Sequence, residues 1–135
     1  MHRFLQNVKW DQGIAARVGQ TCTGVGVSMA RYNNFVAIIG CASGGLANDG
    51  DYGTYICYLS ESTDGAANWA VVATATAASS TDTAYGTSFE WNAQKMADSK
   101  KFLRVNATAA TGTGNVINVD YFRFNSRYPQ ATLST

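Results

Sequence analysis

Apolar and polar residues alternate with a period of two along most of this chain, the pattern of half-buried β-strands. The clearest run covers residues 116–124. Its odd positions form one side of the predicted strand: Ile117, Val119, Tyr121 and Arg123. Its even positions form the other side of the predicted strand: Val116, Asn118, Asp120, Phe122 and Phe124. Residues 54–60 alternate in the same way, with Tyr55, Cys57 and Leu59 on one side.

Several further segments fit the same strand pattern. Strands are predicted at residues 24–30, 35–41, 69–74, 85–91 and 102–108. The segment FVAIIGC at 35–41 is apolar on both sides, which predicts a central strand. Gly- and Asn-rich turns separate the segments, and residues 93–100 contain at most one helical turn. The pattern therefore predicts an all-β fold, an antiparallel β-sandwich or jelly-roll-like single domain.

The two ends of the chain do not follow this alternation. We expect the sandwich over residues 19–125, an irregular N-terminal arm over 1–18, and a C-terminal tail over 126–135. The first segment is basic and too apolar for a free tail, which is typical of an arm that folds onto a neighbour. The alternative is that this segment packs as an edge strand on its own domain.

Charge is scarce in this sequence and unevenly distributed. Charged residues make up 14% of the 135 residues, against about 25% in ordinary soluble domains. Residues 32–94 contain six acids and neither Lys nor Arg, whereas both ends are basic. Either folding brings these segments together so that the surface charge averages out, or the basic ends contact an acidic partner or another copy of the chain. The weak net charge, +1, does not indicate nucleic-acid binding.

The cysteines and acidic residues do not form a recognisable metal site. Cys22, Cys41 and Cys57 lack CxxC spacing, so we expect buried, reduced thiols. The segment 48–51 (NDGD) has oxygen ligands suited to Ca²⁺, but it lacks the downstream Glu, and a Gly-rich hairpin loop is favoured. We expect no cofactor. No apolar stretch is long enough to span a membrane, and the start MHRFLQNVKW has no signal-peptide core, so we expect synthesis in the cytoplasm.

Residues able to carry catalysis are also few. His2 is the sole histidine, so no Ser-His or Cys-His pair is available. Four acidic residues lie in or beside predicted loops, and two of their carboxyl groups would have to lie close together to form a glycosidase pair. These acids are Glu61, Asp64, Asp82 and Glu90. Nothing in their spacing requires such a meeting, and we do not expect an enzyme.

The stretch SESTDGAANWAVV, residues 60–72, allows two interpretations. Asp64-Gly65 has strong turn chemistry, because Asp bonds its own backbone and Gly adopts positive φ. Trp69 either buries its ring in the sandwich or stacks on a ligand. We favour a structural hairpin formed by Asp64, Gly65 and Trp69.

This hairpin and its neighbours resemble small β-sandwich virion proteins of tailed bacteriophages, in particular capsid decoration (cement) proteins. The resemblance covers about residues 20–124 and includes NNFVAIIGCASGG, YLSESTDGAANWAVV and KKFLRVNATAATGTGNV. It implies a non-catalytic protein on the exterior of an icosahedral virion. Such a protein binds the major capsid protein, often as a homotrimer, and bridges neighbouring subunits against internal pressure.

The composition of the chain ends suggests which residues would make such contacts. We expect capsid or partner contacts at Arg3, Phe4, Trp10 and Arg17 in the arm and at Arg123, Arg127 and Tyr128 near the C-terminal exit. We expect neither a nucleic-acid nor a membrane partner.

The alternative function is a carbohydrate-binding β-sandwich module or a fibre or tail adhesion component. The aromatic residues available to stack on sugar would be Trp69, Tyr52, Tyr55 and Tyr85. The hairpin is also similar to the Ser-x-Asp-Gly-x-x-Trp hairpin of discoidin-like carbohydrate-binding sandwiches. This chain has one more alanine between Gly65 and Trp69.

Overall fold

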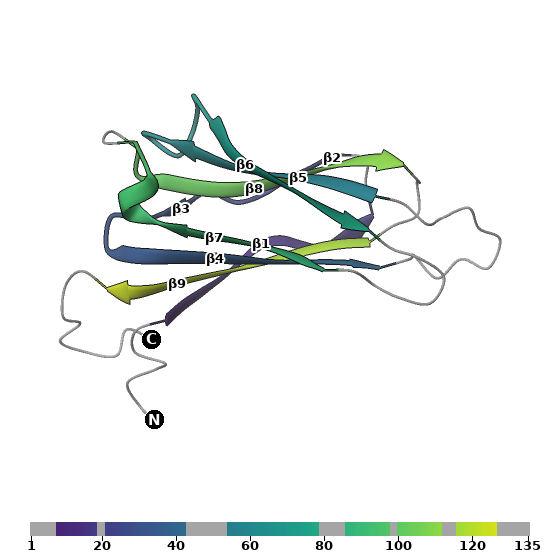
Figure 1. Ribbon diagram of the computed structural model, residues 1–135, viewed down its shortest axis with the longest axis horizontal. Helices are drawn as coiled ribbons and strands as arrows, with labels where there is room; N and C mark the ends of the chain where they lie inside the picture. The colour runs from purple at the N-terminus through teal and green to yellow at the C-terminus, as the bar shows by residue number, and fades with distance from the viewer. Residues whose placement is uncertain are drawn as a thin grey trace.

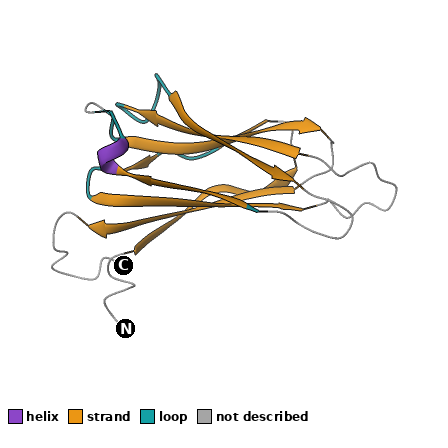
Figure 2. Ribbon diagram, viewed as in Figure 1, coloured by secondary structure: helices purple, strands orange, loops and turns teal. Residues whose placement is uncertain are grey.

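A computed structural model describes residues 8–18, 21–42, 54–78, 86–97, 100–111 and 116–126. These residues form nine strands and one 3₁₀ turn, η1 (Figures 1 and 2). The strands are β1 (Val8–Val18), β2 (Thr21–Thr23), β3 (Val27–Ser28), β4 (Tyr32–Ala42), β5 (Thr54–Ser62), β6 (Ala70–Ala78), β7 (Thr87–Asn92), β8 (Phe102–Thr111) and β9 (Val116–Ser126). Within the range 93–100, where at most one helical turn was expected, the described residues form the 3₁₀ turn η1 (Ala93–Lys95).

The strands pack as two antiparallel sheets, which confirms the predicted β-sandwich (Figure 1). Sheet A has the order β1-β9-β4-β7, and sheet B has the order β2-β8-β5-β6, with the short β3 also paired to β8. The hairpin β5–β6 stays within one sheet. Every other connection between the described strands passes from one sheet to the other, except β2 to β3, which both pair with β8.

The core lies between the inner faces of the two sheets. The odd positions of β9 are buried as the alternation predicts, with Ile117, Val119 and Tyr121 fully inaccessible. The predicted inward positions of β5 are also buried. Phe35 of β4, a central strand as expected, packs against Tyr121 with 5.2 Å between ring centroids.

Tyr121 also connects the sheets through a polar contact. Its hydroxyl on β9 accepts the Val105 N–H of β8 at 2.8 Å. Burial raises the pKa of Tyr121 to about 12. Gly13 makes room for the ring, since a Cβ at that position would lie 2.3 Å from a ring carbon of Tyr121.

The N-terminal segment requires a correction for the part that the structure describes. Residues 8–18, expected within an arm, form edge strand β1 of sheet A, paired with β9 from Val8↔Phe124 to Val18↔Val116. The alternative, an edge strand on its own domain, therefore holds for residues 8–18, and the sandwich includes them. Register shifts between Gln12 and Ile14 and between Ile14 and Arg17 interrupt the period of two, which is why the alternation misses this strand.

Cys22, Cys41 and Cys57 are buried, which confirms their predicted burial, and no disulfide joins them. Burial raises the pKa of Cys57 to about 12, so its thiol stays protonated at neutral pH. No helix among the described residues is long and apolar enough to cross a membrane. Within the same residues, no group of three or more His, Cys, Asp and Glu side chains could hold a metal.

Candidate functional site

The outer surface of sheet A carries a contiguous set of apolar side chains from three neighbouring strands. Cross-strand pairing places Val8 beside Phe124, and Trp10 and Val36 on either side of Phe122. We call this surface the apolar face; its members are Val8, Trp10, Val36, Ile38, Phe122 and Phe124. All of them except Trp10 line an open hollow of about 310 Å³.

Two members of the apolar face are unusually accessible for large apolar side chains. Trp10 is 56% exposed and Ile38 is 51% exposed. Neither contributes to the core between the sheets, because both belong to the outward side of their strands. Large exposed apolar patches on proteins mark interaction sites. The geometry therefore makes this face the main candidate for partner contact.

The border of the apolar face is polar and acidic. The indole Nε1 of Trp10 donates to Asp120 Oδ1 at 3.2 Å, and Asn118 Nδ2 donates to Asp120 Oδ2 at 3.0 Å. Glu90 of β7 is exposed beside Val36. The positions that pair with the members of the apolar face include no Lys or Arg among the described residues, although the exposed Lys9 lies between Val8 and Trp10 on β1. A partner surface with an apolar centre and basic residues around it would match this arrangement.

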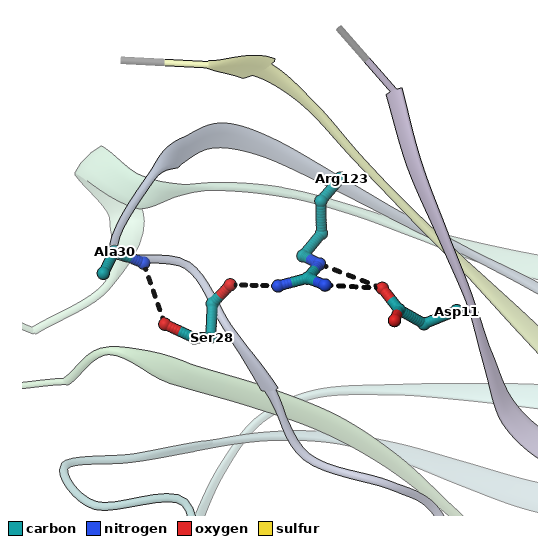
Figure 3. Close-up of polar contacts among 4 residues, drawn as sticks. All are labelled: Asp11, Ser28, Ala30 and Arg123. Atoms are coloured by element: carbon teal, nitrogen blue, oxygen red, sulfur yellow. Dashed lines mark hydrogen bonds and ion pairs between the residues drawn. The ribbon is translucent and has the colours of Figure 1, made fainter. Parts of the chain in front are cut away.

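Arg123 was expected as a partner contact, but the structure places it in an internal network (Figure 3). Its Nε and Nη2 donate to Asp11 Oδ2 at 3.1 and 2.6 Å, and its Nη1 donates to the Ser28 carbonyl at 2.6 Å. Its guanidinium also lies over the Tyr32 ring. With 11% of its side chain exposed, Arg123 joins β9, β1, β3 and β4 and is not available to a partner.

The hairpin between β5 and β6 is organised by its own side chains. The Ser62 hydroxyl donates to the Ala67 carbonyl at 2.6 Å. Asp64 Oδ1 accepts the Ala66 and Ala67 N–H groups, and these hydrogen bonds lower the pKa of Asp64. Gly65 has φ of 75°, the left-handed conformation expected at a turn. Asp64 and Gly65 thus shape the loop that leads to Trp69.

Trp69 occupies a different place from the one expected. Its ring packs against the guanidinium of Arg104, 4.2 Å from the ring centroid, and against Gly26. It does not belong to the core cluster between the sheets. Both Trp69 Nε1 and Arg104 Nε are buried without an acceptor among the described residues. Burial lowers the pKa of Arg104.

The outer surface of sheet B is rich in hydroxyl and amide groups, although Val71, which pairs with Ser60, is 57% exposed there. Pairing aligns Thr23, Asn106, Tyr58 and Thr74 across four strands, and Thr21, Thr108, Ile56 and Thr76 form the next row. We call these eight residues the hydroxyl face. Ser60 and Arg104 form the neighbouring pair on the side of Trp69.

The three described acidic residues among those considered for catalysis do not converge on one cleft. Glu61 is buried at 6% exposure, and its Oε2 has no partner among the described residues. Asp64 binds the backbone of its own loop, and Glu90 is exposed on the outer side of sheet A. Asp82 lies outside the described residues.

The remaining predicted site residues have mixed outcomes. Trp10 is exposed on the apolar face, and Arg17 pairs with Ile117 at the far end of β1. Tyr55, considered for sugar stacking, is 1% exposed in the core and cannot contact a ligand. Other candidates lie outside the described residues: Arg3, Phe4, Arg127, Tyr128, Tyr52, Tyr85 and the segment 48–51.

Trp10 is the one member of the apolar face that was expected from the sequence as a contact residue. The other five were missed: Val8, Val36, Ile38, Phe122 and Phe124. A signal was present, because Phe122 and Phe124 lie on the same side of their strand as the polar residues Asn118 and Asp120. No protein-family model matches the chain, and no curated protein matches it at the significance required of a relative.

Proposed function

We propose that this protein is a non-catalytic attachment protein that decorates the exterior of an icosahedral phage capsid and bridges its major capsid subunits. The observation that carries the proposal is the apolar face, where Trp10 and Ile38 are more than half exposed. An apolar surface of this kind gains free energy when a partner removes it from water.

The rest of the surface supports an attachment role over catalysis. The described acids do not form a cleft, and few charged residues are present in the sequence. Coat subunits with an apolar patch among Lys and Arg side chains would match the acidic border formed by Asp120 and Glu90. In a homotrimer, three apolar faces would act together and raise the apparent affinity by about 10²–10⁴.

The strand order supports the jelly-roll part of the expected fold. If β2 and β3 count as one interrupted strand, the described strands divide into two sheets of four with nearly every connection crossing between them. We infer that this is the jelly-roll arrangement of two Greek keys, which occurs in viral capsid and lectin domains.

The test is attachment to purified capsids of the phage whose genome encodes the chain. We expect the protein to co-sediment with expanded capsids at a fixed, saturable ratio to the major capsid protein. Ile38→Lys places a cation in the apolar face and should abolish co-sedimentation. The matched control is Thr74→Lys on the exposed outer side of sheet B, which should leave it unchanged.

Two results would contradict the proposal. If the protein were found only on tails or fibres, a tail component would replace capsid decoration. If Ile38→Lys and wild type occupied capsids equally, the apolar face would not be the attachment surface.

A further inference from the structure

We propose that the hydroxyl face of sheet B, together with Arg104, binds an acidic saccharide, and that Arg104 receives its carboxylate. This site lies on the opposite sheet from the apolar face, so it does not depend on the capsid proposal. Three observations lead to it: an arginine without an anion, two buried donors without an acceptor, and the composition of the face.

Arg104 is held in place without a counter-ion among the described residues. Its guanidinium lies on the Trp69 ring at 4.2 Å, and no carboxylate of the described residues lies within ion-pair distance. Arg123 provides the comparison within the same molecule, because two of its nitrogens bind Asp11. Aromatic stacking fixes the orientation of a guanidinium, so that its planar set of N–H donors is ready to bind a carboxylate.

The Arg104–Trp69 pair also lacks hydrogen-bond acceptors. Arg104 Nε and Trp69 Nε1 are both buried donors with no partner among the described residues, and they belong to side chains in direct contact. Buried donors in native proteins are nearly always satisfied, by protein, water or ligand. The described chain thus leaves both donors to be satisfied from elsewhere, and in the proposed site ligand oxygen atoms fill this role.

The adjoining row of the hydroxyl face suits sugar hydroxyl groups. Thr23, Asn106, Tyr58 and Thr74 span four strands, a width of about 14 Å at the usual strand spacing. Tyr58 is half-buried in the centre of this row, diagonally adjacent to Arg104. Asn106 Oδ1 accepts the Gly24 N–H, which fixes the orientation of the amide. An aromatic ring between hydroxyl and amide groups is a common arrangement in saccharide recognition.

The charge of the face selects an acidic sugar over a neutral one. The paired positions on its two rows and in the Ser60–Arg104 pair include one cation, Arg104, and no acid. A uronic or sialic acid supplies both the carboxylate for the guanidinium and the hydroxyls for the Thr and Asn side chains.

Isothermal titration with oligogalacturonate and sialyllactose tests the proposal, with lactose as the uncharged probe. We expect at least one acidic probe to bind, and to bind tighter than lactose. Arg104→Gln should weaken this binding about tenfold or more, as expected for a lost charged hydrogen bond, while Arg104→Lys retains part of it. Tyr58→Ala should weaken binding of the same probe.

Controls separate a specific site from general attraction and from misfolding. Lys101→Gln removes an exposed cation from outside the face and should leave binding unchanged, and each variant must keep the wild-type thermal midpoint. Equal binding of acidic and neutral probes, no binding at millimolar concentration, or equal losses in Lys101→Gln and Arg104→Gln would each overturn the proposal. None of these results would affect capsid attachment, which uses the other sheet.

Discussion

The outer side of sheet A exposes Trp10 and Ile38 beside further apolar side chains, whereas the outer side of sheet B exposes mainly threonine, with Val71 as an apolar exception. Both surfaces come from the same strand alternation, and both sheets bury similar apolar inner faces. The inner faces are therefore explained by folding alone.

Solvent would favour polar side chains on both outer faces, so folding does not explain the difference between them. The apolar face leaves large side chains in water with no benefit to the core. The hydroxyl face shows that this sandwich tolerates polar outward positions. The contrast between the two sheets thus separates what the fold requires from what a partner would require.

The largest effect on the stability of the two sheets is expected from removing the Arg123 network, which connects them at one end. Arg123→Ala leaves Asp11 partly buried without its cation and should lower the free energy of unfolding by about 3 kcal/mol. Urea denaturation measures the change. Arg31→Ala, at an exposed arginine of the same end, should stay within about 0.5 kcal/mol. Equal effects would show that the Arg123 network adds no stability.

The hydrogen bond between the sheets gives the next largest effect. Tyr121→Phe leaves the buried Val105 N–H without its acceptor and should cost about 1–3 kcal/mol. Because burial raises the folded-state pKa of Tyr121 to about 12, its contribution is complete below pH 10 and lost as the pH rises toward 12. Tyr121→Phe should therefore flatten the loss of stability in this alkaline range. An unchanged slope would mean that another group titrates there.

A smaller effect is expected at the hairpin that positions Trp69 on sheet B. Gly65→Ala requires a side chain at φ of 75° and places its Cβ 2.7 Å from the Phe102 ring. We expect a loss of about 1–2 kcal/mol by thermal unfolding. Asp64→Ala should destabilise less, and the Asp64 contribution should fade as the pH falls through its lowered pKa. A larger loss for Asp64→Ala would reverse the importance of the two residues.

The variants with the smallest expected effect on stability give the clearest comparison between the outer faces of the two sheets. Ile38→Lys and Thr74→Lys each change one exposed side chain, so both should alter the free energy of unfolding by no more than about 0.5 kcal/mol. Their behaviour should differ only when a partner is present. If Ile38→Lys alone unfolded the protein, the apolar face would be part of the core and not a docking surface.

Much of the fold could be predicted because the alternation is regular where the strands are regular. The side chains of β9 and β5 face the directions that the sequence predicts. β1 could be predicted only as the alternative to an arm, because two register shifts break its period. Strand order depends on pairing between distant segments, such as Val8 with Phe124, and no local pattern records it.

The candidate site was harder to predict. Arg123 shares a side with Ile117, Val119 and Tyr121, so its burial, and its need for a partner, could have been inferred from the same alternation. Trp69 could not have been placed, because the hairpin turns its ring onto Arg104, a residue 35 positions away in the sequence.

The strands that form the apolar face are far apart in the sequence and are therefore synthesised at different times. β1 is the first described strand to leave the ribosome and β9 is the last, yet they lie side by side in sheet A. β9 also separates β1 from β4. A nascent chain therefore cannot assemble the apolar face until β9 has emerged, so a partner that recognised this face would bind only the completed sandwich.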